Sequence, residues 1–111
     1  MQILVVEPGK VPVIAEISGT LKEMQEIVGG TIQAIYPFPE DVTLVCNDEG
    51  KLLGMPPNHA LRDERGNPYD IICGTFFLCG VSPDNESFSS LSQDQLTRFQ
   101  RQFHTPEVLC K

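Results

Sequence analysis

The sequence has no apolar stretch near the roughly 18 residues that a membrane-spanning helix needs. It also runs from Met1 directly into the segment QILVVE, without the basic region and the small-residue cleavage site of a secretory signal. We therefore expect a cytoplasmic protein that has no membrane partner.

Cysteine is sparse, and no two cysteines form the C-x-x-C pair typical of metal or redox sites. Cys73 and Cys79 are expected on one strand, roughly 20 Å apart at about 3.3 Å per residue, which is too far for a disulfide. His59 and His104 lack the spacing of metal ligands. We therefore expect reduced thiols, no metal and no other cofactor. The chain has four cysteines: Cys46, Cys73, Cys79 and Cys110.

Basic residues are also few, since eight Lys and Arg stand against fifteen Asp and Glu, a net charge of −7. This balance repels a phosphate backbone and disfavours sequence-independent binding of nucleic acid. The charge either keeps a small domain soluble or forms an acidic surface that docks on a basic protein. The acidic residues gather at Glu40-Asp41, Asp48-Glu49, Asp63-Glu64 and Asp84 to Glu86.

Motifs of catalysis are missing as well. No serine lies in a G-x-S-x-G elbow, and the apolar surroundings of each cysteine disfavour a reactive thiolate. The segment NDEGK has neither the ligand spacing of a calcium loop nor the pattern of a phosphate loop. The sequence therefore favours a protein that is not an enzyme.

The composition that remains is that of an ordinary folded domain, with 111 residues, 41% hydrophobic and 21% charged. It predicts one globular domain over residues 1–111. Apolar, β-branched runs predict strands at residues 2–7, 13–17, 31–38 and 42–47, with a turn at Pro8-Gly9. A turn at 47–50 is predicted to lead into a hairpin partner at 51–54. Residues 70–81 predict one long central strand, in which Gly74 marks a bulge or a close contact.

Two capping boxes predict the helices. Thr20 and Glu23 start the first, whose apolar face comprises Leu21, Met24, Ile27 and Val28 and which ends at Gly29-Gly30. Ser92 and Gln95 start the second, which buries Leu96, Phe99 and Phe103 and stops before Thr105-Pro106. The order of elements predicts an α+β fold, with two short helices packed on a mostly antiparallel sheet of five to six strands.

Several segments, which span most of the chain from Leu21 to Glu107, resemble a family of small uncharacterised proteins. They are IVGGTIQAI, VTLVCNDEGKLLGMPPNHAL, DIICGTFFLCG and FSSLSQDQLTRFQRQFHTPE. The family is a domain of unknown function found in phages, plasmids and conjugative elements of Gram-positive bacteria. The resemblance implies no activity and no catalytic residues. It implies an accessory protein of a mobile element, located in the host cytoplasm if a phage encodes it.

The segment MPPNHALR is the most suggestive part of the chain for binding, because two prolines stiffen it beside a cluster of polar side chains. NHAL is expected either as one helical turn or as an extended piece. In the simpler interpretation, Asn58 only caps that turn.

Small mobile-element proteins often interfere with host defences, and one way is to sequester a nucleotide-derived signal. Such a ligand needs aromatic faces, amides and a few cations. We therefore expect a non-enzymatic homo-oligomer that sequesters a small nucleotide-derived signalling molecule. The alternative is an acidic interaction module, a DNA mimic or an inhibitor of a host defence protein. The expected ligand-binding residues are Asn58, His59, Arg62, Tyr69, Tyr36 and Lys51, with Phe38 and Arg65 as further candidates.

Overall fold

A six-stranded sheet forms the centre of the fold in a computed structural model that describes residues 1–84 and 86–109. The strand order is β2-β1-β7-β4-β3, with β8 paired to β7, and every pairing between described strands is antiparallel. The strands are β1 (Gln2–Val6), β2 (Val13–Glu16), β3 (Ile32–Ile35), β4 (Val42–Asn47), β7 (Phe76–Val81) and β8 (Phe88–Ser89).

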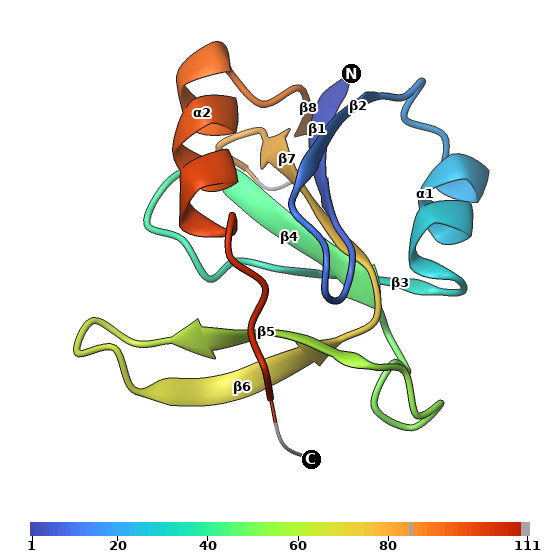
Figure 1. Ribbon diagram of the computed structural model, residues 1–111. Helices are drawn as coiled ribbons and strands as arrows, with labels where there is room; N and C mark the ends of the chain where they lie inside the picture. Colours follow the sequence, from blue (N-terminus) through green and yellow to red (C-terminus); the bar gives the residue numbers. More distant parts are fainter. Residues whose placement is uncertain (85, 110–111) are drawn as a thin grey trace.

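A second, two-stranded sheet lies below the first in Figure 1. It is a hairpin of β5 (Pro57–Arg62) and β6 (Pro68–Cys73). Leu61 and Ile72 from this hairpin join the same apolar cluster as the main sheet, so burial of these side chains fixes the hairpin to the body of the protein.

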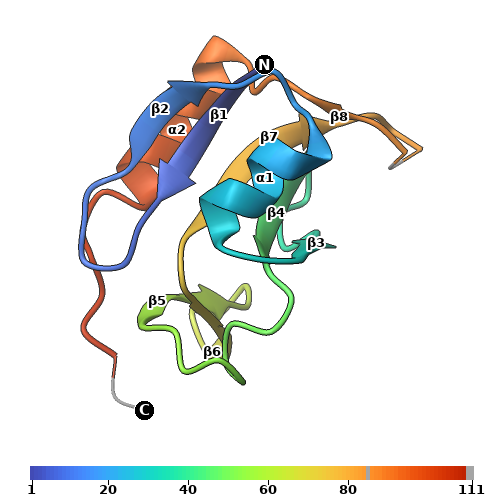
Figure 2. The same ribbon diagram turned by 90° about the vertical axis from the view of Figure 1, so that its right-hand side faces the viewer.

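The two helices cover opposite faces of the main sheet, as Figures 1 and 2 show. Side chains alternate between the faces of a strand, and β1 shows the result: Leu4 packs in the cluster that contains Leu96, and Ile3 packs in the cluster that contains Met24. The helices are α1 (Leu21–Val28) and α2 (Gln93–Gln102). These elements confirm the predicted α+β class.

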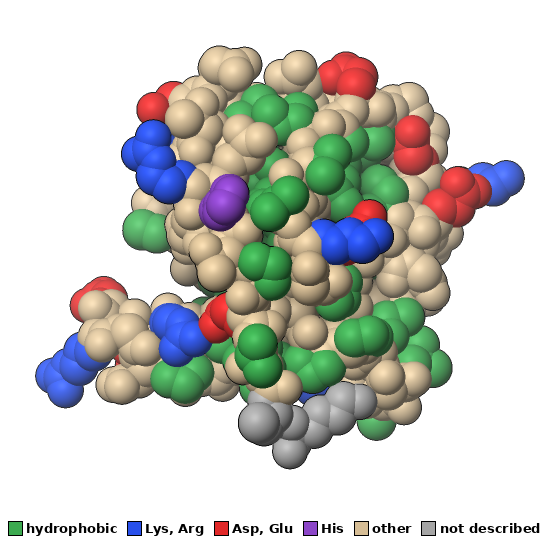
Figure 3. All heavy atoms as spheres, in the orientation of Figure 1, with side chains coloured by type: hydrophobic (Ala, Val, Ile, Leu, Met, Phe, Trp, Pro, Cys, Tyr) green, Lys and Arg blue, Asp and Glu red, His purple; other side chains and the backbone are tan. Residues whose placement is uncertain are grey.

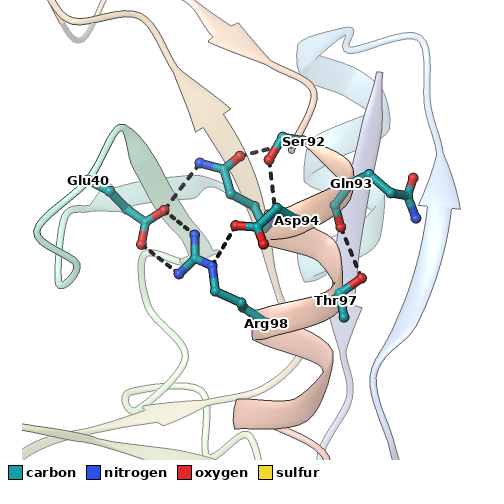
Figure 4. Close-up of polar contacts among 7 residues, drawn as sticks. Glu40, Ser92, Gln93, Asp94, Thr97 and Arg98 are labelled. Atoms are coloured by element: carbon teal, nitrogen blue, oxygen red, sulfur yellow. Dashed lines mark hydrogen bonds and ion pairs between the residues drawn. The ribbon is translucent and has the colours of Figure 1, made fainter.

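The predicted capping box of α2 is confirmed. The Gln95 amide donates to the Ser92 hydroxyl at 3.1 Å, and the Ser92 amide donates to the Gln95 side chain at 2.8 Å. Figure 4 shows this start of the helix beside Glu40, which bridges the loop before β4 to Arg98. Hydrogen bonds at the first turn and at this bridge therefore fix one end of α2.

Only one of the two hydrogen bonds of the predicted capping box of α1 is present. Thr20 accepts from the Glu23 amide at 3.2 Å, but the Glu23 carboxylate binds the amides of Ser18 and Gly19. The preceding turn folds back over the helix end and offers these amides to the carboxylate. Leu21, predicted on the buried face, is 56% exposed, because the body of the sheet lies under the positions of Met24 and Val28.

The predicted single strand at 70–81 is wrong. The run divides into β6 and β7, and Gly74 between them has a φ of +86°. Left-handed backbone at this position turns the chain from the second sheet into the main sheet. The predicted close contact is confirmed, because Met55 packs against Gly74.

The predicted hairpin between residues 42–47 and 51–54 is also wrong. Residues 48–54 are turns, and both edges of β4 are already paired, one with β3 and one with β7. Asn47 directs the chain away from the sheet, since its Oδ1 accepts from the Glu49 amide at 2.8 Å. The NHAL segment is extended, as part of β5.

Candidate functional site

A surface groove of about 500 Å³ lies between the β3–β4 connection and the β5–β6 hairpin. We call it the aromatic groove. In Figure 3 the hairpin extends from the body at the lower left, with basic and acidic side chains along it. A recess of about 120 Å³ adjoins the groove and also reaches Ala60, Gln102 and Phe103. The groove is lined by Tyr36, Pro37, Phe38, Pro39, Arg62, Asp63, Glu64, Arg65 and Tyr69.

One wall of the aromatic groove is firmly packed. The Phe38 ring lies 4.8 Å from that of Phe99 and 6.4 Å from that of Phe103, measured between ring centroids. Pro37 and Pro39 flank Phe38 and restrict the backbone on either side. The adjacent Tyr36 is 47% exposed, so its ring is presented on a rigid support.

The opposite wall is the hairpin. Tyr69 on β6 is 59% exposed and lines both the groove and the recess. The hairpin turn is closed by Asp63, whose Oδ1 accepts from the amides of Arg65 and Asn67, each at 2.9 Å. One oxygen of the Asp63 carboxylate is therefore occupied by its own turn. Arg65 forms no ion pair with any residue in the described parts of the chain.

Arg62 belongs to a second cluster, centred on Glu107. The Glu107 carboxylate accepts from the Ala60 amide at 2.9 Å and from the Arg62 guanidinium, and lies 2.9 Å from His59 Nδ1. We call these three donors the Glu107 clamp. Burial alone would raise the pKa of Glu107, but the bonds from Ala60, Arg62 and His59 outweigh it and hold the pKa below its usual 4.5.

His59 is inside this cluster rather than on the surface. Its side chain is 5% exposed, and its ring meets those of Phe76 and Phe103 edge to face at 6.2 and 5.1 Å. Because a carboxylate only accepts, Nδ1 carries the proton that points at Glu107. Nε2 is buried and has no hydrogen-bond partner among the described residues.

Asn58 is a structural clip. Its side chain is 1% exposed, and its Nδ2 donates to the carbonyls of Val6 and Gly74 at 2.8 and 2.9 Å. One amide thus joins the end of β1 to the bend between β6 and β7. Both of its protons are used in these bonds, so Asn58 has no donor left to offer a ligand.

Lys51 lies apart from the groove, where it pairs with Asp70. It lines two other hollows, of about 330 and 480 Å³, beside β6. Among the six predicted site residues, the structure therefore brings Tyr36, Arg62 and Tyr69 together. His59 shares the Glu107 carboxylate with Arg62 but does not line the groove, and Asn58 and Lys51 lie elsewhere.

Sequence reasoning did not single out Glu107. The residue lies 45 to 48 positions from its partners, and no local pattern marks it. The only relevant signal was the stop at Thr105-Pro106, which indicates that the chain leaves the helix before Glu107 and takes another direction.

Cys46 and Cys79 are unsuited to nucleophilic chemistry. Burial, aided by the charges of Asp70 and Asp48, raises the pKa of Cys46 to about 11, and burial raises the pKa of Cys79 to about 12. Cys46, Cys73 and Cys79 are all free, although Cys73 and Cys79 lie on separate strands and not on one as predicted. Cys110 is outside the described residues.

The described residues show neither a metal-binding cluster nor a membrane-spanning helix. They contain no group of three or more His, Cys, Asp or Glu side chains arranged to hold a metal ion. Within residues 1–84 and 86–109, no helix has the length and the apolar character that crossing a membrane requires.

The fold and the site define a small α+β domain with an open, aromatic-lined surface groove. The chain belongs to the family described as Domain of unknown function (DUF3846), whose model matches residues 1–104. No curated protein and no solved structure shows significant similarity to it. The predicted membership of a family of unknown function is thereby confirmed.

Proposed function

We propose that this protein binds a small nucleotide-derived molecule in the aromatic groove and sequesters it without chemical change. The observation that carries the proposal is the convergence of two exposed tyrosines, Tyr36 and Tyr69, with Arg62 and Arg65 around one hollow. The volume of about 500 Å³ falls in the range of roughly 300–1,000 Å³ typical of small-molecule sites.

The chemistry of the groove suits a base attached to an anion. Stacking of a base on an aromatic side chain contributes about 1–3 kcal/mol, and both tyrosine rings are accessible for it. Arg62 and Arg65 supply guanidinium donors that match phosphate geometry. Because Asp63 is bound within its own turn, its repulsion of an anion is reduced. Glu64 is the other acidic side chain that lines the groove, and it stands against two arginines. A net charge of −7 is thus compatible with capture of a single anion.

The biological role that we propose is counter-defence. The resemblance to proteins of phages, plasmids and conjugative elements suggests an accessory protein of a mobile element that acts in the host cytoplasm. Capture of a signalling nucleotide requires no catalytic residue, which fits a chain whose described cysteines are buried or partly buried. Such a protein works by mass action, so it must be abundant relative to the signal.

Calorimetry of the full chain against cyclic dinucleotides and ADP-ribose-type nucleotides tests this proposal. We expect saturable heat for at least one of them. Tyr69→Ala should then weaken binding about tenfold, as expected for loss of about 1.4 kcal/mol of stacking, and Tyr69→Phe should retain most of the affinity. Leu52→Ala, at a side chain that is 88% exposed outside the groove, is the control and should change nothing.

Two results would contradict the proposal. One is the absence of heat for every nucleotide at protein concentrations of tens of micromolar. The other is chemical change of the bound ligand. Mass spectrometry of the ligand released by heating should show an unchanged molecule, whereas a cleaved product would make the protein an enzyme.

A second candidate function is an acidic interaction module that docks on a host protein. A hollow of about 400 Å³ between α1 and the β1–β2 ribbon favours it, because acidic side chains surround an apolar floor. Such a surface suits a basic amphipathic segment, and its binding should weaken steeply with salt. A pull-down from host lysate that returns no partner at low salt would argue against this candidate. The lining residues are Val5, Glu7, Ala15, Ile17, Glu23, Glu26, Ile27 and Thr75.

We also propose that the protein forms a homo-oligomer through β2. Within the described residues β2 pairs only with β1, so its outer edge offers unpaired backbone groups. Val13 and Ile14 on it are 58% and 38% exposed. Light scattering should give a dimer mass, and Ile14→Lys should give a monomer. A monomer mass for the unaltered chain would exclude this association.

A further inference from the structure

The Glu107 clamp has the composition of an anion-binding site. Three donors of different kinds, an imidazole N–H, a backbone amide and a guanidinium, converge on one carboxylate. They come from His59, Ala60 and Arg62, within four consecutive residues of β5. Charge-assisted bonds of this kind are about twice as strong as neutral ones, so the cluster favours a negatively charged occupant.

Two of the three donors, on His59 and Ala60, are held in place independently of their occupant. The His59 ring is fixed between Phe76 and Phe103, and β5 pairs with β6 on one side only among the described strands. The amide of Ala60 therefore points to an open edge, where a carboxylate takes the place of a neighbouring strand. Asn58 anchors the start of the same strand.

The occupant comes from a different part of the chain. The family model matches residues 1–104, which include all three donors, whereas Glu107 lies beyond that match. The Glu107 side chain is 22% exposed and that of the adjacent Val108 is 98% exposed, so this segment inserts its carboxylate while the next side chain lies in solvent. The site thus belongs to the body of the domain, and its anion comes from the segment that follows.

The clamp is continuous with the aromatic groove. Ala60 and Arg62 line the recess that adjoins the groove, and Arg62 also lines the groove itself. We propose that His59, the Ala60 amide and Arg62 form an anion-binding site, that Glu107 occupies it in cis, and that the phosphate of the groove ligand replaces the Glu107 carboxylate. The last step rests on the proposed function, whereas the existence of the anion site does not.

Because Glu107 of the same chain occupies the anion site, an external ligand must bind strongly enough to displace it. A group tethered by a short segment has an effective concentration of about millimolar. If Glu107 leaves the site free for one tenth of the time, an external ligand binds about tenfold more weakly than it would bind an empty site. Glu107 would thus hold the affinity for weak, common anions low. A ligand that also stacks on Tyr36 and Tyr69 would overcome this competition.

The test uses ¹⁵N-labelled full chain titrated with inorganic phosphate and pyrophosphate. In Glu107→Ala we expect a saturable shift of the Ala60 amide resonance, with an affinity about tenfold above that of the unaltered chain. Adding Arg62→Ala to Glu107→Ala should abolish this shift of the Ala60 amide resonance. Glu107→Gln, which keeps the size of the side chain and removes its charge, should give an intermediate affinity and serves if the alanine variant does not fold.

Glu40→Ala is the matched control. Combined with Asp94→Ala, it removes both carboxylates that bind Arg98, whereas no buried imidazole or strand amide shares that site (Figure 4). The double variant should create no phosphate site. Equal binding by this double variant and by Glu107→Ala would mean that any freed arginine suffices, and would overturn the inference. A folded Glu107→Ala or Glu107→Gln variant without a saturable shift at Ala60 would also overturn it.

The outcomes separate this inference from the proposed function. If phosphate binds Glu107→Ala at Ala60 but no nucleotide binds any variant, the anion site stands and the proposed function fails. If a nucleotide binds the unaltered chain and Glu107→Ala equally, without a shift at Ala60, the proposed function stands and the anion site is wrong.

Discussion

Gly74 packs directly against Met55. A β-carbon added at Gly74 would lie 2.7 Å from the Met55 sulfur and 3.3 Å from its Cβ, and the backbone there has a φ of +86°. Two separate features, the close contact and the left-handed backbone, thus require glycine where the chain passes from one sheet to the other.

Gly74→Ala should lower the free energy of unfolding by about 2–5 kcal/mol, from about 1–2 kcal/mol of backbone strain and about 1–3 kcal/mol of overpacking. Gly54→Ala is the matched control, because its φ is +69° but nothing lies within 4 Å of the added atom. Urea denaturation of both variants should show the larger loss at Gly74. Equal losses would mean that the contact with Met55 contributes nothing.

Asn58→Ala should lower the free energy of unfolding by about 2–4 kcal/mol, because it deprives the carbonyls of Val6 and Gly74 of a buried donor. Denaturation followed by circular dichroism measures this loss. Gln33→Ala, at the exposed position of β3, should leave the free energy of unfolding nearly unchanged. A loss below about 1 kcal/mol, the net value of a single ordinary bond, would contradict the role of Asn58 as a clip.

The attachment of Glu107 should be lost in acid. Its pKa in the folded protein lies below the usual 4.5, so ionised Glu107 stabilises the protein fully above pH 4.5, and this contribution disappears as the pH falls through the lower, folded-state pKa. The ¹³C resonance of the Glu107 carboxyl should titrate with a midpoint below pH 4.5. The resonance of the Ala60 amide should shift over the same pH range. In Glu107→Gln the Ala60 transition should vanish. A midpoint at or above the usual value would refute the clamp.

Alkylation should separate the cysteines. Cys79 is fully buried and its thiol has a pKa raised to about 12, so iodoacetamide should modify it only after unfolding; Cys46, with a pKa of about 11, should behave similarly. Cys73 is only partly buried and should react before Cys46 and Cys79. Peptide mapping of native and denatured samples measures the order. Native-state modification of Cys79 at the rate of Cys73 would contradict the buried position of β7.

Local patterns predicted the elements of this fold better than their connections. Ser92 and Gln95 are three residues apart, so the sequence alone contains both halves of that cap. Gly74 shows the limit: the residues on both sides of it are equally apolar, and a pattern of hydrophobicity does not tell a bulge in one strand from a bend between two sheets.

The site shows the same limit. Tyr36, Arg62 and Tyr69 were predicted from the chemistry that a ligand needs, and the fold brings them to one groove. The pairing of Glu107 with His59 depends on how the last segment crosses β5, which no short-range spacing encodes. Asn58 and His59 were predicted to contact a ligand, but both side chains are buried. The ladder between β5 and β6 is irregular between Pro57 and His59, which interrupts the alternation of side chains. Asn58 therefore binds the carbonyls of Val6 and Gly74, and His59 packs against Phe76 and Phe103.

The aromatic groove has one wall that the fold fixes and one that it leaves open to change. Phe38 is embedded in the aromatic cluster under α2, whereas the turn at residues 63–67 closes on itself through Asp63 and projects from the body in Figure 1. Insertions or exchanges in that turn would reshape the groove without disturbing the core. The architecture is therefore suited to rapid diversification, in which new ligand preferences arise by exchanging a few residues of a single hairpin.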